Sequence, residues 1–183
     1  MSDVLRTLIA LEGDHRLHQA RLLVLLRAFA GPKNTATVEG LTKLAKLDFL
    51  LRYPTYLERA IAKRPGQAAK VRVRDEERLS VESRMVRYRY GPWDDRYREI
   101  LNELVGLDLA HVAVRGRTVH IGLTDRGLET ARTLSQSPAY EDTARRASLL
   151  KAKLNLSATG LMRFVYDTFP EIADLRLREE IQP

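Results

Sequence analysis

Hydrophobic residues recur at helical spacing over most of the chain, which predicts a mainly helical protein. The clearest helix lies between Asp14, which can cap it, and the stop at Gly31-Pro32. Apolar residues cover most of its circumference, so we expect it at the centre of the core. Further helices are predicted over 3–12 until Gly13, from Thr35 or Thr37 to Tyr53, over 55–63, from Asp94 or Asp95 to 105, over 125–135, from Pro138, and from Ser157 to Pro170.

Alternation of apolar and polar residues predicts a β-hairpin near the middle of the chain. Residues 109–114 and 118–123 each place three apolar side chains on one face. The apolar faces of the two strands lie on the same side of the hairpin when the turn is at Arg115-Gly116, where glycine favours a tight turn. The pairs expected from this register include Val112 with Val119 and His111 with His120.

The segment 65–92 breaks the helical pattern. Pro65-Gly66 and Gly91-Pro92 punctuate it, and short alternating runs lie between them around Val71 to Arg74 and over 85–90. We interpret this segment as loop or weak strands inserted between helices.

A helix that ends near Gly106, then a hairpin, then a helix opened by Leu123-Thr124-Asp125-Arg126-Gly127 is the element order of a winged helix. The signature resembles the end of many winged-helix domains, which bind DNA, RNA or proteins. We therefore predict an α+β fold, mainly α with a small β-hairpin wing, in which a winged-helix domain carries additional N- and C-terminal helices. The expected division is a winged-helix-like domain over 1–136, with the basic insertion at about 65–92, and a C-terminal helical extension over 137–183 packed on it.

A narrower resemblance covers most of the chain. It is carried by the helix GLTKLAKLDFLLRYP at 40–54, the Tyr-Gly-Pro-Trp segment at 90–93, the motif at 123–127, Ser137-Pro138-Ala139-Tyr140, Arg145-Arg146-Ala147 and a last helix with Phe164. These features resemble the middle component of bacterial ABC-three-component systems, the group that includes Lamassu-type phage defence. The resemblance implies a non-enzymatic adaptor that accompanies an SMC- or Rad50-like ATPase and an effector subunit, often a nuclease.

Positive charge is concentrated in one part of the chain. Of a net charge of +7, the stretch 52–98 supplies most, with 13 lysines and arginines against 7 acidic residues. Arginine suits phosphate because its guanidinium meets two oxygens at once, and interleaved Tyr88 and Trp93 could stack on bases. The hypothesis is a contact with double-stranded DNA, mostly non-specific, while an acidic protein partner or a solvated face remain alternatives. The candidate nucleic-acid-binding residues are Arg72, Arg74, Arg84, Arg87 and Arg89, with Arg115 and Arg117 at the hairpin tip.

The helix expected before the hairpin is acidic. Residues 94–106 hold four acidic and two basic side chains, and a helix that enters a major groove meets phosphates on both sides. The net negative charge of this helix disfavours its insertion into a major groove to contact bases, and it favours binding to a protein partner. The candidate partner-binding residues are Asp95, Glu99, Glu103 and Phe164. The alternatives are a free-standing winged-helix transcriptional regulator and an antitoxin-like interaction module.

Composition and motifs narrow the chemistry further. The absence of cysteine excludes disulfides, a thiol nucleophile and cysteine-ligated metals, and no apolar run reaches the roughly 20 residues of a membrane span. No nucleotide-binding glycine loop, metalloprotease or hydrolase motif occurs. We expect a cytoplasmic protein with no catalytic residues, no cofactor, no metal site and no membrane contact.

Overall fold

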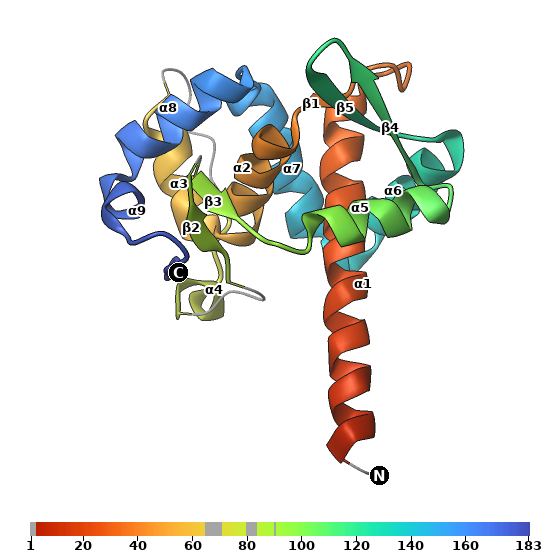
Figure 1. The fold of residues 1–183 in the computed structure, drawn as a ribbon, viewed down its shortest axis with the longest axis horizontal. Helices are drawn as coiled ribbons and strands as arrows, with labels where there is room; N and C mark the ends of the chain where they lie inside the picture. Colours follow the sequence, from red (N-terminus) through yellow and green to blue (C-terminus); the bar gives the residue numbers. More distant parts are fainter. Residues whose placement is uncertain (1–2, 65–70, 80–83, 90) are drawn as a thin grey trace.

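The computed structural model describes residues 3–64, 71–79, 84–89 and 91–183, with side chains from His15 onward. The fold is α+β and mainly helical, with a three-stranded antiparallel sheet and a separate two-stranded hairpin (Figure 1). The sheet lies at one end of the long helix α1, and the two-stranded hairpin lies in the other half of the molecule. Pro65-Gly66 falls outside the described residues, as does Tyr90.

Helix α1, Asp3–Ala30, runs through the molecule, and its first turns extend beyond the other elements (Figure 1). The prediction of two helices separated at Gly13 was wrong. One glycine costs a helix interior only about 1 kcal/mol relative to alanine, too little to end a helix continued on both sides. The predicted position of the second half of α1 at the centre of the core is confirmed, since residues on all sides of the helix are buried: Leu22, Leu23, Val24, Leu25, Leu26 and Phe29.

Helices α2, Leu41–Arg52, and α3, Pro54–Ala62, form an angled pair in which Pro54 opens the second helix, as expected. The predicted start of α2 at Thr35 or Thr37 was wrong. Residues 38–39 form strand β1, Val38–Glu39, and Gly40 then turns the chain with φ 91° before the helix begins. Tertiary pairing of β1 with another strand explains the late start.

The three-stranded sheet has the order β1-β5-β4, with β4 at Ala110–Arg115 and β5 at Thr118–Leu123. The hairpin and its faces were predicted, but its register was wrong by two. Val112 lies opposite Ile121, Val114 opposite Val119, and His111 opposite Gly122. The turn residues are Gly116 and Arg117, and Gly116 has φ 61° at the first central position, the geometry of a type II′ turn.

The two histidines are therefore not directly opposite each other. His120 lies opposite Ala113, with Nδ1 3.0 Å from the Thr37 hydroxyl, and the His111 ring packs over the glycine opposite it.

Helix α6, Asp125–Gln136, starts as predicted, with Thr124 Oγ1 accepting from the Gly127 backbone N–H at 2.9 Å. A Cβ on Gly127 would lie 1.7 Å from the Leu109 carbonyl oxygen. The glycine of the Leu-Thr-x-x-Gly motif thus permits the close approach of α6 to the chain that enters β4.

The segment after α3 contains more regular structure than predicted. Residues 71–74 form no strand, and helix α4, Asp75–Leu79, follows. Strands β2, Val86–Tyr88, and β3, Gly91–Trp93, form the two-stranded hairpin. The C-terminal tail lies along β2, where Arg178 and Ile181 donate backbone hydrogen bonds of 2.7 and 2.8 Å to the carbonyls of Arg87 and Met85.

Helix α5, Tyr97–Gly106, precedes the three-stranded sheet. The prediction that Asp94 or Asp95 is the N-cap residue was wrong, since Arg96 has that position. Asp94 Oδ1 instead accepts from the Arg96 backbone N–H at 3.0 Å, just before the helix begins. Gly106 is the last helical residue rather than the cap beyond the end, and Asp108 takes the positive φ of 56°.

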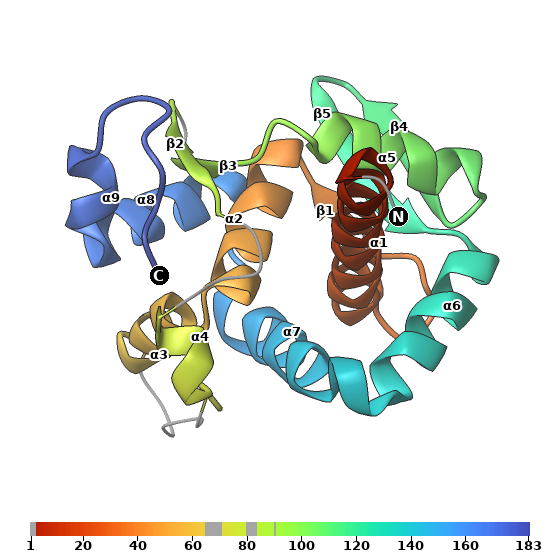
Figure 2. The ribbon, with the colours of Figure 1, turned by 90° about the horizontal axis from the view of Figure 1, so that it is seen from below.

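The C-terminal part begins with a 3-10 turn, Pro138–Tyr140, followed by α7, Glu141–Leu154, α8, Ala158–Thr168, and the short α9, Pro170–Asp174. Ser157 caps α8 by accepting from Gly160 N–H, as predicted. Helix α7 packs on α1 and α2, and α8 packs on α2 (Figure 2). Within the described part of the chain, no helix is long and apolar enough to cross a membrane.

Candidate interfaces and a charged pocket

The arginines of the basic segment lie around α4 and β2, and several face carboxylates of the protein itself. Arg74 donates to Asp142 at 2.8 Å, and Arg84 donates to Glu180 at 3.0 Å. Arg87 is half-buried in the hairpin beside the C-terminal tail, and Arg89 also has an interaction partner. Arg72 is exposed. Internal pairing therefore neutralises part of the positive charge that the sequence places here.

The tip of the β4–β5 hairpin is different. Arg115 and Arg117 are exposed, and neither forms an ion pair or a side-chain hydrogen bond with any described residue. The tight turn at Gly116 places both side chains at the outer end of the sheet. Two unpaired guanidinium groups on one turn can bind phosphate oxygens.

The structure does not bring these two sets of arginines together. The β4–β5 hairpin and the segment formed by α4 and β2 lie in opposite halves of the molecule in both views (Figures 1 and 2). The two sets of arginines therefore lie on different parts of the molecule.

The candidate partner-binding residues are spread over two places. Asp95 is exposed and accepts from Trp93 Nε1 at 3.1 Å and from Arg178 at 2.5 Å. On α5, Glu99 is exposed, while Glu103 accepts from Gln19 of α1 at 2.5 Å. Phe164 is half-buried on α8, where the Arg64 guanidinium covers its ring at 5.5 Å.

Glu99 and Glu103 also lie beside His15, so that one ligand atom of each falls within 4.8 Å of the others. Carboxylates and imidazole are zinc-type ligands, but a full site needs a fourth partner or water and a supporting shell. Because Gln19 and His15 already contact Glu103 inside the fold, these contacts account for the cluster as a junction between α1 and α5.

Four apolar side chains are exposed on the two neighbouring elements α5 and β4. They are Val105 and Leu107 at the C-terminal end of α5 and Val112 and Val114 of the edge strand β4, and we call them the apolar patch; Val114 is 70% exposed. Ala110, Val112 and Val114 share one face of β4, as predicted, but only Ala110 is buried among the three. An edge strand with exposed valines is a surface on which another chain can pack.

A buried charge network links α1, α2 and the entry to α5, and sequence reasoning missed it. Asp48 is completely buried and accepts from Arg21 Nε, Arg52 Nε and Tyr97 Oη at 2.8, 2.8 and 2.7 Å. Arg52 also donates to Asp94 at 2.8 Å. Burial by itself raises the pKa of Asp48, but the two guanidinium groups outweigh this effect and hold the pKa well below its usual range.

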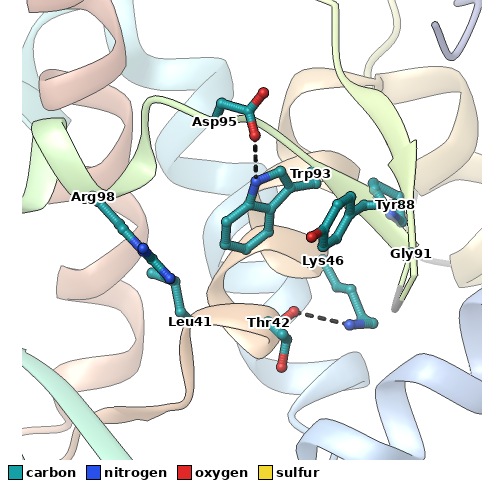
Figure 3. A pocket seen from close by; sticks show the side chains of 9 residues that line it. Leu41, Thr42, Lys46, Tyr88, Gly91, Trp93, Asp95 and Arg98 are labelled. Carbon is teal, nitrogen blue, oxygen red and sulfur yellow. Dashed lines mark hydrogen bonds between the residues drawn. The ribbon is translucent and has the colours of Figure 1, made fainter. Parts of the chain in front are cut away.

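A cavity of about 430 Å³ opens next to this network, between α2, the β2–β3 hairpin and the start of α5. The rings of Tyr88 and Trp93 lie beside each other at its wall, 6.0 Å apart between centroids and tilted by 30° (Figure 3). The other lining residues are Leu41, Thr42, Lys46, Gly91, Pro92, Asp95 and Arg98.

Lys46 reaches this cavity from α2. It is only 2% exposed, and its ammonium donates to the Thr42 carbonyl at 3.0 Å (Figure 3). Its stem lies against Gly91, whose φ of 114° is a backbone conformation that favours glycine. No described residue forms an ion pair with Lys46, and burial lowers its pKa to about 8.

The sequence of α2 contains the feature that could have identified both the Asp48 network and the cavity beside Lys46. Apolar residues occupy all sides of this helix, including Leu44, Leu47, Phe49, Leu50 and Leu51, so its charged residues have no free face. A helix that is apolar all round is buried, and any charge on it must find a partner or a cavity. The partners of Asp48 and Lys46 come from α1, the entry to α5 and the β2–β3 hairpin, and only the tertiary structure brings these elements next to α2.

Compared with models of protein families, with curated proteins and with solved structures, the chain gives no significant match.

Proposed function

We propose that this chain is a non-enzymatic winged-helix adaptor of an SMC- or Rad50-like ATPase complex in anti-phage or anti-plasmid defence. In this proposal α1, β1, α2 and α5 with the β4–β5 hairpin form the winged helix, and α3 to β3 are an insertion. The order β1-β5-β4 of the sheet supports this assignment. The resemblance over 40–164 supports the defence context, in which an effector nuclease is a further partner.

The observation that carries the adaptor proposal is the surface of α5 and β4. In a groove-reading winged helix, the helix before the hairpin enters the DNA. Here that helix exposes Glu99 and ends in the apolar Val105 and Leu107, beside the exposed valines of β4. Negative charge opposes phosphate, whereas apolar area next to an unpaired strand edge favours protein contact.

Contact with double-stranded DNA is assigned to the hairpin tip. Arg115 and Arg117 are exposed candidate residues on one tight turn, and no described neighbour neutralises their charges. Such contacts bind phosphates without reading sequence, so the affinity belongs to the non-specific range of roughly 10⁻⁴–10⁻⁶ M. The same unpaired arginines favour the second candidate function, a free-standing transcriptional regulator, which requires a specific site nearer roughly 10⁻⁸–10⁻¹¹ M.

The adaptor proposal is tested by affinity purification of the tagged chain from its native cells, read by mass spectrometry. We expect a large coiled-coil ATPase in near-stoichiometric amount. The double variant Leu107→Glu with Val114→Glu should lose it, because both changes place charge on the apolar patch. Leu79→Glu is the matched control, since Leu79 is exposed on α4, away from this patch. Recovery of the chain alone with one promoter fragment would support the regulator instead.

The DNA contact is tested separately by titration of duplex DNA at several salt concentrations. Arg115→Glu with Arg117→Glu should weaken binding and lower the salt slope by about 2, since each phosphate contact contributes about 0.9. Arg87→Glu with Arg89→Glu tests the basic segment, where the half-burial of Arg87 and the internal partner of Arg89 predict a smaller effect. An unchanged slope in the tip variant would contradict the assignment of the tip.

A further inference from the structure

The cavity beside Lys46 has the composition of a ligand site rather than of a packing defect. Its volume of about 430 Å³ falls in the range of small-molecule sites, roughly 300–1,000 Å³. Aromatic rings form one wall, and charged groups lie at its base and rim (Figure 3). Packing defects in protein cores are apolar and small, whereas this cavity contains a buried cation.

The positive charges that line the cavity favour an anionic ligand. The Lys46 ammonium has three N–H donors and a single acceptor among the described residues, the Thr42 carbonyl. Arg98, from α5, adds a second cation without a carboxylate partner in the same described set. The one acidic lining residue, Asp95, is already held by Trp93 and Arg178.

The aromatic wall favours a ligand with a flat ring. Asp95 accepts from the Trp93 indole N–H and so fixes the indole, which leaves a ring face as its contact surface (Figure 3). The Tyr88 ring stands 6.0 Å from it, too close to admit a third ring between them, so a ligand stacks on the wall rather than inside it. Base–aromatic stacking tolerates any base.

We propose that this cavity binds a nucleotide, with its base stacked on the Tyr88–Trp93 wall and its phosphate held by the Lys46 ammonium, while Arg98 adds positive charge on the other side of the cavity. The site is separate from the hairpin tip and the apolar patch, and it does not depend on the adaptor function. The nucleotide has two sources, a free nucleoside monophosphate or an unpaired nucleotide of a DNA or RNA strand. Both present the same ring and phosphate.

The single tryptophan of the chain makes the test direct, because Trp93 is the only source of indole fluorescence. We would titrate the protein with AMP, UMP, adenosine, inorganic phosphate and benzoate, and with thymidylate oligomers of one to eight residues. Quenching by AMP at a concentration at least tenfold below that needed for adenosine or phosphate is the expected result. Affinity that rises with oligomer length identifies a strand as the source, and affinity independent of length identifies the free nucleotide.

Two variants decide whether the named cations act. Lys46→Met and Arg98→Gln should each weaken AMP binding at least tenfold, while Tyr88→Leu should weaken AMP more than phosphate. Lys33→Met, an exposed lysine after α1, is the matched control and should bind as wild type. Arg115→Glu with Arg117→Glu should also leave AMP binding unchanged, which keeps this result independent of the DNA contact.

The inference is overturned if no nucleotide or oligomer changes the fluorescence or releases heat in calorimetry. It is equally overturned if AMP binds the Lys46→Met protein as tightly as wild type, or if benzoate binds and nucleotides do not.

Discussion

Helix α2 buries the charged residues Lys46 and Asp48, two positions apart, in opposite electrostatic surroundings. Asp48 receives three hydrogen bonds from Arg21, Arg52 and Tyr97. Lys46 has one backbone carbonyl and a cavity. The pKa of each group reflects the difference, since Asp48 stays ionised far below its usual range while burial makes the Lys46 ammonium easier to deprotonate.

The comparison separates structural charge from charge that is available to a ligand. A buried ion that is fully hydrogen-bonded offsets its desolvation, and it ties together the elements that supply its partners. A buried ion without a counter-charge keeps a net desolvation penalty, and natural proteins retain such groups mainly at functional sites. Three changes test this contrast, and they follow in order of expected effect.

Asp48→Asn should reduce the free energy of unfolding by about 3–5 kcal/mol, because it leaves the buried Arg21 guanidinium without a carboxylate and the buried Arg52 guanidinium with Asp94 alone. Urea denaturation followed by circular dichroism measures the loss. Asp174→Asn, on the exposed surface of α9, is the matched control and should change stability by less than about 0.5 kcal/mol. A loss below about 1 kcal/mol at Asp48 would show that the network is not a structural junction.

Acid should destabilise the same region. Folding lowers the pKa of Asp48 and of Asp94 from the ordinary 3.8; burial opposes the shift in both, and arginine contacts overcome it. Their stabilising contribution is therefore complete above about pH 5 and is lost as the pH falls through the lowered values, about 2–3 kcal/mol for each carboxylate. Urea midpoints between pH 7 and 2 measure it. The Asp94→Asn protein should show a shallower decline, and an identical decline would contradict the contribution of Asp94.

Lys46→Met should have the opposite sign and stabilise the protein by about 3 kcal/mol at pH 7. The pKa of Lys46 falls from 10.5 unfolded to about 8 folded, so the penalty on the charged form is complete below pH 8. It disappears as the pH rises from 8 to 10.5, and over that range wild type should approach the variant in stability. Thermal unfolding at pH 7, 9 and 10.5 measures the gap. Destabilisation at pH 7 would place Lys46 with Asp48 as a structural charge.

Much of the fold was predictable because its signals are local. Thr124 and Ser157 cap helices at the expected residues, Pro54 opens α3, and the apolar circumference of residues 22–29 placed α1 in the core. Capping, proline geometry and periodicity act within a few residues, so the chain displays them without its tertiary context.

The hairpin shows where local signals stop. Alternation identified both strands and their matching faces, yet two registers satisfy the same alternation, and Gly116 serves either as the first or the second turn residue. The choice depends on backbone geometry at Gly116 and on pairing of β5 with β1. Strand β1 itself was not predicted, because a two-residue strand has no pattern of its own.

The candidate site was predicted less well than the fold. The basic residues 72–89 were identified by composition, but their meaning depends on distant carboxylates such as Asp142 and Glu180. The sequence also marked Tyr88 and Trp93 as aromatic residues among arginines, without the lysine of α2 that lies beside them.

The sequence by itself determined the helical elements, their caps, the hairpin, the burial of α1 and the position of the positive charge, because each depends on neighbours in the chain. Only the tertiary structure decided which charges are neutralised, which strand register forms and that Lys46 faces a cavity while Asp48 meets two arginines. Electrostatic energies depend on distance and on burial between segments far apart in sequence, and the amino-acid order does not contain those distances.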